Sequence, residues 1–264
     1  MIECGHLLPE GLPEGLKIFQ LTRDRDTPSC HVYMEAPVFT PDSNGIVLNR
    51  GAHPHGPDKE NPRHAYLFCD LSDGGQTRPL TLPEEHRCTS PAVDPKGHWL
   101  YYFVDETTPG GGRLVLRRVG LDGTARETLA VLDGPVAGTR FRARKPYPLS
   151  TISADGRRLA LQVFLGDGYS RKSPFGVLGF DLESGDHTLP GWGPTLLNCH
   201  AQYARTRDPE RVRDLLIQEN HDCIVNTRGE NIFARKIGMV DLHVLRDDGT
   251  NLRDIPLGRD EREL

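Results

Sequence analysis

The densest group of side chains able to carry out acid–base chemistry is the run Asn-Cys-His-Ala-Gln-Tyr at 198–203. His200 and Gln202 are two residues apart, so on an extended strand their side chains share one face. A neutral imidazole such as that of His200 can take up a proton near neutral pH or bind a metal ion. Hydrogen bonding between neighbouring structural elements explains the same pair equally well.

Two further polar segments carry residues that suit ligand binding. The run Gln-Glu-Asn-His-Asp-Cys at 218–223 follows an apolar strand, and Asn220 and His221 stand where that strand is expected to end. An exposed loop is the simpler interpretation of this run. His31 and Tyr33 alternate onto one face of another strand, where they suit stacking on a sugar ring, although packing between elements explains them as well.

The chain has one dense basic run, Arg-Phe-Arg-Ala-Arg-Lys at 140–145. The guanidinium of Arg144 could neutralise a carboxylated substrate, but a solvated loop is the simpler interpretation. His53 and His55 form an H-x-H pair, which is a weak signal for a metal site because no carboxylate supports it. The sequence contains no P-loop, zinc-protease or serine-hydrolase motif.

The composition excludes several classes of partner. The 264 residues carry 32 basic and 37 acidic side chains, a formal net charge of −5, which gives no basic surface for a nucleic acid. No apolar stretch reaches the length of a membrane span, and the first residues lack the pattern of a secretion signal. The six cysteines are too far apart for a C-x-x-C motif, so reduced thiols are expected. We therefore expect a cytoplasmic protein.

A repeated pattern of strands and turns must position these side chains. Each repeat has two apolar strands joined by an Asp or Gly turn, and then two more strands joined by a Gly turn. The first turn is marked by Asp42, Asp94, Asp155 and Asp208. The second turn is marked by Gly74, Gly123, Gly185 and Gly249. Because both landmarks keep one period, with 52, 61 and 53 residues between the aspartates, the pattern indicates an internal repeat.

The repeat predicts an all-β protein, a β-propeller of four-stranded blades. We expect one domain over residues 1–264, with blades at 31–82, 88–132, 148–190 and 198–257. The segment 15–22 is predicted to be a lone N-terminal strand that closes the ring by completing its last blade. Since four blades are few for a propeller, we expect them to be part of an incomplete ring of about seven.

Several short motifs occur in a fixed order along the chain. They are Ile-Phe-Gln-Leu-Thr at 18–22, His-Val-Tyr at 31–33, Phe-Thr-Pro-Asp at 39–42, His-Ala-Gln-Tyr at 200–203, Asn-His at 220–221 and Asp-Asp-Gly-Thr-Asn at 247–251. In this order they resemble the oligogalacturonate lyases, a family of pectin-degrading propellers, and their TolB-like relatives. The turn at 39–42 is generic to TolB-type propellers, whereas the segments around His200 and Asn220 are more specific.

The resemblance implies a lyase that cleaves short oligogalacturonides by β-elimination. By its place in the order of motifs, His200 matches the family's candidate base, which removes the proton beside the uronate carboxylate. The residues expected to contact substrate are His31, Tyr33, Arg144, Gln202, Asn220 and His221. A divalent metal, typically manganese, would neutralise the developing charge in a complete chain, and its ligands are expected beyond Leu264.

Other functions stay open at this point. A non-catalytic TolB-like propeller would bind a carbohydrate or a protein partner through the same surfaces. A relative with the lyase fold could also act on another uronate or sugar. On the lyase interpretation, the partner is a small acidic oligosaccharide and the role is pectin catabolism.

Overall fold

The computed structural model describes residues 1–24, 26–51, 61–108, 111–166, 174–221, 223–225, 231–234 and 240–255. In these residues, antiparallel strands supply nearly all of the regular structure, and helix is limited to two 3₁₀ turns, Gly5–Leu7 and Pro83–Glu85. The strands form four larger sheets and two two-stranded sheets. The predicted all-β fold class is confirmed.

Each of the four larger sheets is one blade, with its strands in chain order from one edge to the other. The first blade consists of β3 (Ser29–His31), β4 (Gly45–Arg50), β5 (Ala65–Asp70) and β6 (Gln76–Pro79). The second blade consists of β7 (Cys88–Val93), β8 (Trp99–Asp105), β9 (Leu114–Gly120) and β10 (Glu127–Leu132).

The third and fourth blades are more elaborate. The third contains β11 (Arg142–Arg144), β12 (Ser150–Ile152), β13 (Arg158–Gly166), β14 (Phe175–Asp181) and β15 (His187–Gly193), and both β11 and β12 pair with β13. The fourth contains β16 (Gln202–Tyr203), β17 (Asp214–Asn220), β20 (Val240–Arg246) and β21 (Arg253–Ile255). A hairpin of β18 (Cys223–Val225) and β19 (Asn231–Ala234) lies between β17 and β20 in the chain.

The core lies between successive blades, because the first three blades bury both faces of their middle strands. In β8, Leu100 and Tyr102 pack in the cluster shared with the first blade. Their neighbours Tyr101 and Phe103 point to the opposite face and pack against the third blade. A third cluster joins the third and fourth blades. This face-to-face packing of successive sheets is the defining feature of a propeller.

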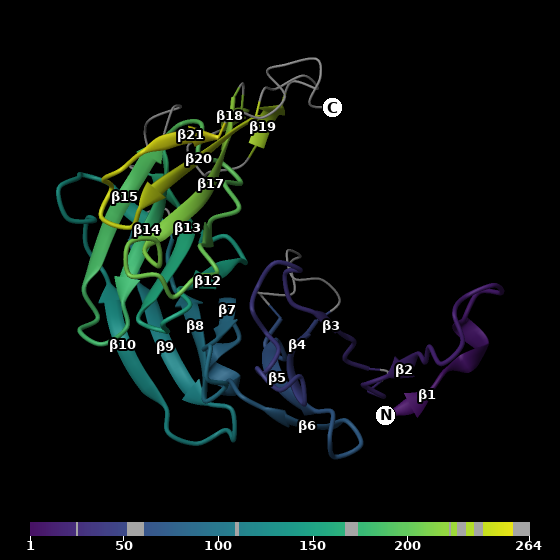
Figure 1. Ribbon diagram of the computed structural model, residues 1–264. Helices are drawn as coiled ribbons and strands as arrows, with labels where there is room; N and C mark the ends of the chain where they lie inside the picture. The colour runs from purple at the N-terminus through teal and green to yellow at the C-terminus, as the bar shows by residue number, and fades with distance from the viewer. Residues whose placement is uncertain are drawn as a thin grey trace.

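The four blades follow one another in an arc, with the first and fourth at its two ends (Figure 1). The inner strand of the third blade, β12, lies beside β7 of the second blade and β16 of the fourth. The inner strands of the blades therefore gather around one axis. The chain enters each inner strand at one end of this axis, and the first turn of each blade lies at the other end.

The turn after the inner strand folds as the repeat predicts in the first three blades. In the second blade, the Asp94 carboxylate accepts hydrogen bonds from the backbone N–H groups of His98 (2.6 Å) and Trp99 (2.8 Å). Gly97 follows with a φ of 74°, and a Cβ there would lie 2.6 Å from Cδ of Pro41 in the first blade. Glycine is therefore required both by the backbone conformation and by the neighbouring turn.

The predicted closing strand is only partly extended. Within 15–22, β2 (Phe19–Gln20) pairs with β1 (Ile2–Glu3), and β1 is the one strand that pairs with it among the described residues. Closure of a ring by this segment stays a prediction. Within the part of the chain that the structure describes, no helix has the length and hydropathy of a membrane span. Cys4, Cys30, Cys69, Cys88 and Cys199 form no disulfide.

Candidate functional site

Side chains from three blades meet where the chain runs into the inner strands. Nδ1 of His200, just before β16, lies 2.6 Å from Oε2 of Glu35, which follows β3 in the first blade. The two residues are 165 positions apart in the sequence, and they link the two ends of the arc of blades. The side chain of His200 is 24% exposed and that of Glu35 is 38% exposed, so both remain open to solvent and to a ligand.

Two tyrosines stand beside this pair. The His200 ring lies 5.8 Å from the ring of Tyr33 and 5.7 Å from that of Tyr147, measured between centroids. The two tyrosine hydroxyls are 2.7 Å apart and share a hydrogen bond. Burial, and then the hydrogen bond with Tyr33, raise the pKa of Tyr147 well above its ordinary value. Tyr147 is therefore protonated at neutral pH.

The segment before β16 is held in an unusual backbone conformation. Asn198 and His200 both have left-handed φ angles, 58° and 45°. Between them, Cys199 is fully buried, and its N–H donates to Oε1 of Gln162 in the third blade at 2.8 Å. Burial raises the pKa of Cys199 to about 12, so it is present as a thiol. Anchoring of Cys199 thus directs His200 outward.

This conformation changes the prediction for Gln202. Strand β16 begins at Gln202 and His200 is left-handed, so alternation along a strand does not apply to the pair. Oε1 of Gln202 instead accepts a hydrogen bond from Nη2 of Arg205 at 3.3 Å. Contact of Gln202 with substrate stays a prediction.

Asn220 supports the site from the second strand of the fourth blade. Its Nδ2 donates to the carbonyl oxygens of Leu197 (2.5 Å) and Asn198 (3.1 Å), and its Oδ1 accepts from Nε2 of Gln218. These bonds fix the backbone that presents His200. The neighbouring His221 contacts Asp241, with 2.9 Å between Nε2 and Oδ2. In the structure Asn220 therefore positions the backbone of His200, whereas His221 forms a separate pair with Asp241.

The remaining predicted residues lie around the cluster. His31 is exposed, and its Nδ1 faces the carbonyl oxygen of Val32. Arg144 is only 4% exposed, so the solvated-loop interpretation is wrong for this residue. Its guanidinium carbon lies 6.0 Å from the ring centroid of Phe164, and desolvation lowers its pKa. His53 and His55 lie outside the described residues.

Two residues of the site were missed by the sequence interpretation. Glu35 follows Tyr33 by two positions and Tyr147 precedes β12 by three, but neither stands in a motif. Tyr147 is held by the second blade, because its carbonyl oxygen accepts a hydrogen bond from the Ser90 hydroxyl at 2.5 Å. No pattern in the sequence predicts contacts of this kind between blades.

The residues at this site do not fit a manganese ion. The groups that meet here are one imidazole, one carboxylate and two phenol hydroxyls. Within the described ranges of the chain, no group of three or more His, Cys, Asp or Glu side chains could hold a metal ion. Transition metals and manganese require several such donors converging on one point. No step of the chemistry is therefore assigned to a metal.

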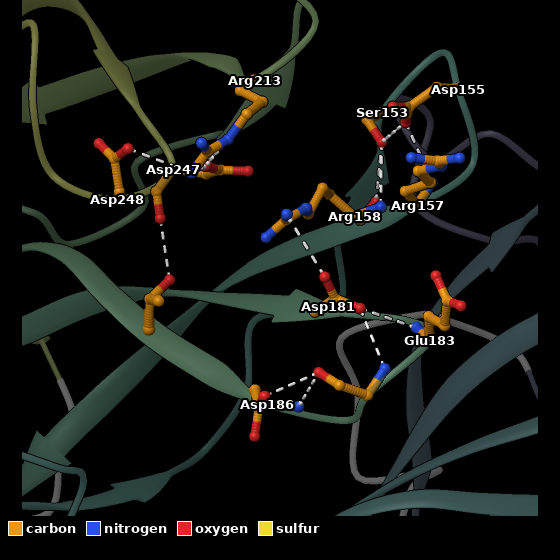
Figure 2. Close-up of polar contacts among 12 residues, drawn as sticks. Ser153, Asp155, Arg157, Arg158, Asp181, Glu183, Asp186, Arg213, Asp247 and Asp248 are labelled. Carbon is orange, nitrogen blue, oxygen red and sulfur yellow. Dashed lines mark hydrogen bonds and ion pairs between the residues drawn. The ribbon is translucent and has the colours of Figure 1, made fainter.

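A second polar cluster, between the third and fourth blades, is structural (Figure 2). The buried carboxylate of Asp247 accepts hydrogen bonds from Nε of Arg213 (2.7 Å) and the hydroxyl of Tyr203 (3.1 Å). Its carbonyl oxygen accepts one from the Thr188 hydroxyl in the third blade. The carboxylate of Asp247 is thus occupied within the fourth blade, and its carbonyl oxygen links this blade to the third.

Comparison with known proteins identifies similar structures. No protein-family model and no curated protein matches the sequence. An oligogalacturonate lyase in complex with manganese matches with a TM-score of 0.55 and 18% identity, over 89% of this chain and 55% of that one. The oligogalacturonate lyase from Vibrio parahaemolyticus matches with a TM-score of 0.56 and 15% identity, over 90% of this chain and 55% of that one. A putative TolB from Agrobacterium tumefaciens has a TM-score of 0.45 and 12% identity, over 84% of this chain and 80% of that one.

The fold and the site define the class as a β-propeller with an open cluster of polar side chains near its axis. Its fold is shared with the oligogalacturonate lyases, so the resemblance suggested by the sequence motifs is confirmed at the level of fold. The chain spans about 55% of the length of these lyases. At identities of 15% and 18%, the likeness concerns the fold, and activity is a matter for proposal.

Proposed function

We propose that this chain is an oligogalacturonate lyase-like protein that binds a short oligogalacturonide and breaks it by β-elimination. The binding site is the cluster of His200, Glu35, Tyr33 and Tyr147, which we call the His200 mouth. The contact between His200 and Glu35 supports the proposal most, because an imidazole held by a carboxylate and open to solvent is suited to act as the base. Turnover of pectin fragments in the cytoplasm is the corresponding cellular role.

The geometry supports a specific assignment of protons. With Oε2 of Glu35 accepting the Nδ1–H of His200, the Nε2 atom carries the lone pair and acts as base. It takes the proton from C5 of the uronate, the C5–H electrons form the C4–C5 double bond, and the bond from C4 to the leaving oxygen breaks. A phenol of the Tyr33–Tyr147 pair protonates that oxygen.

The negative charge of the substrate needs a cation near the site. Arg144 is three residues before Tyr147 and is buried over Phe164. None of its side-chain nitrogens forms a hydrogen bond or an ion pair with a described residue, and its Nε is buried without a partner. Since an unpaired buried guanidinium is costly, a substrate carboxylate is a suitable partner. We assign Arg144 to substrate binding, with His31 and Tyr33 as stacking partners for the sugar.

The class of reaction can be tested with digalacturonate. A lyase gives a product with a C4–C5 double bond that absorbs in the ultraviolet, whereas a hydrolase gives saturated galacturonate. The chain is incubated with digalacturonate, with and without added Mn²⁺, and the products are followed by absorbance and mass spectrometry. We expect unsaturated product. Binding of digalacturonate by calorimetry with no product under either condition would instead make the chain a non-catalytic carbohydrate-binding propeller.

A further inference from the structure

The other end of the inner strands forms a separate pocket. A cavity of about 350 Å³ lies there, lined by residues from the first turn of every blade. Arg205 and Arg207 contribute from the fourth blade, just after β16. Because His200 precedes β16 and these arginines follow it, the pocket and the His200 mouth lie at opposite ends of the strand. None of the residues in the proposed elimination lines this pocket.

The fourth blade departs from the other three at this pocket. The first turn of the first three blades is closed by similar backbone hydrogen bonds, at Thr40, Asp94 and Ser153. The next residue in each turn is Pro41, Pro95 or Ala154, which are small and apolar, and all three line the pocket. The corresponding bond in the fourth blade is made by Ala204, and the residue that follows is Arg205.

The fourth turn is also longer, and this adds a second guanidinium. The closing bond runs from Thr40 to Gly45 in the first blade, but from Ala204 to Asp214 in the fourth. Arg207 lies in the additional residues and lines the pocket. An insertion and a replacement in a single repeat therefore both bring positive charge to the same cavity.

Neither guanidinium is neutralised within the part of the chain that the structure describes. Arg205 donates to the neutral amide oxygen of Gln202 at 3.3 Å. Arg207 forms no hydrogen bond, ion pair or ring contact with a described residue, and both side chains are exposed. Asp94 also lines the pocket, but its carboxylate already accepts backbone N–H groups in its own turn, including that of Trp99. The pocket is positive in a chain whose formal net charge is −5.

The rest of the wall is apolar and includes an exposed aromatic ring. Phe39 is 56% exposed although it is a large hydrophobic residue. Val93 and Ile152 line the pocket beside it and are buried, so they form an apolar floor. A surface that combines an open aromatic face with two guanidiniums is complementary to a ligand with a flat apolar body and an anionic group.

We propose that this pocket binds a small aromatic carboxylate. Its carboxylate lies between Arg205 and Arg207, and its ring packs on Phe39 above the apolar floor. This site is distinct from the His200 mouth and does not depend on the lyase activity. A hydrogen bond to a charged group is stronger than one between neutral groups, so loss of both guanidiniums is expected to weaken binding by at least about tenfold.

Calorimetric titration with 3-phenylpropionate tests the proposal. The wild-type chain is expected to bind one equivalent, with affinity that falls as salt is added because the contact is ionic. The double variant Arg205→Gln/Arg207→Gln is expected to lose at least about tenfold in affinity. Arg211→Gln is the matched control, because Arg211 is an exposed arginine of the same turn that does not line the pocket. It is expected to bind like the wild type.

Two further ligands and one further variant separate the parts of the proposal. Propionate and inorganic phosphate carry the charge without the ring, and Phe39→Ser removes the aromatic wall. Weaker binding of both anions, and of 3-phenylpropionate by Phe39→Ser, supports an aromatic carboxylate site. Equal binding of all three ligands, unchanged by Phe39→Ser, overturns the aromatic part. Absence of saturable binding, or full affinity in the double arginine variant, overturns the whole proposal.

Discussion

At the scale of single residues, the site depends on how Glu35 holds His200. The carboxylate accepts from Nδ1 at 2.6 Å, which fixes the ring orientation and the tautomer needed by a general base. The left-handed backbone at His200 directs the side chain out of the strand and toward the first blade. Glu35 is therefore a positioning residue that acts through the imidazole.

Substitution Glu35→Gln tests this role. The amide keeps the shape of the side chain but can present its NH₂ to Nδ1, which favours the wrong tautomer. We predict that kcat on digalacturonate falls by at least about tenfold while KM changes little. Steady-state kinetics measure the two constants separately. Partial recovery in Glu35→Asp is expected, and an unchanged kcat in Glu35→Gln would remove the role.

At the scale of elements, the blade turns carry specific backbone requirements. Gly249, in the second turn of the fourth blade, has a φ of 83°, and a Cβ there would lie 2.9 Å from the carbonyl oxygen of Pro190 in the third blade. Both the backbone conformation and the neighbouring blade therefore exclude a side chain. This turn sets how the fourth blade rests on the third.

We predict that Gly249→Ala destabilises the fold by at least about 1–2 kcal/mol, the cost of a left-handed alanine, with an added cost for the contact. Gly134→Ala is the control, since a Cβ at Gly134 meets nothing within 4 Å. This control is expected to stay within about 0.5 kcal/mol of the wild type. Urea unfolding gives both values, and equal stability of the two variants would contradict the role of the turn.

The aspartates of the turns predict sensitivity to acid. Hydrogen bonds from the turn lower the pKa of Asp42, Asp122, Asp181 and Asp248 below the ordinary value of 3.8. A lowered folded pKa adds stability that is present above about pH 4 and is lost as the pH falls through the folded pKa. Thermal unfolding between pH 5 and pH 2 measures this loss. In Asp181→Asn the unfolding temperature should depend less steeply on pH than in the wild type. An unchanged pH dependence would refute the contribution of Asp181 to acid sensitivity.

The parts of the structure that could be predicted from the sequence are those fixed locally. Turn residues such as Asp94 and Gly97 specify each hairpin by themselves, so the period of the blades is visible in the sequence. The split inner strand of the third blade, β11 and β12, could not be foreseen because both pieces are short and depend on β13. The same holds for Glu35 and Tyr147, whose contacts with His200 arise only when the blades pack around a common axis.

At the scale of the whole molecule, polar clusters between blades hold the arc together. Asp247 is 3% exposed, and its carboxylate binds Arg213 and Tyr203. Its backbone carbonyl oxygen accepts a hydrogen bond from the Thr188 hydroxyl in the third blade. Figure 2 shows Arg213 beside Asp247 and Asp248 in the fourth blade. Loss of the Asp247 carboxylate is costly, because the buried Tyr203 hydroxyl loses its acceptor and Arg213 loses one of its two carboxylate partners.

We predict that Asp247→Ala destabilises the protein by about 1–3 kcal/mol, since it leaves the buried Tyr203 hydroxyl without its acceptor, while Arg213 keeps Asp248 as a partner. Asp73→Ala, at an exposed site in the first blade, is expected to change stability by less than about 0.5 kcal/mol. Chemical unfolding followed by circular dichroism compares the two variants. Equal stability of Asp247→Ala and the wild type would show that the fourth blade does not rely on this carboxylate.

The most direct test of the central claim compares His200→Gln with His98→Gln in the digalacturonate assay. His98 is an exposed histidine in the first turn of the second blade, remote from the proposed proton transfers. We predict unsaturated product from the wild type and from His98→Gln, and a rate lower by at least about a hundredfold in His200→Gln, as expected for loss of a general base. Undiminished product from His200→Gln would contradict the assignment of His200 as the base.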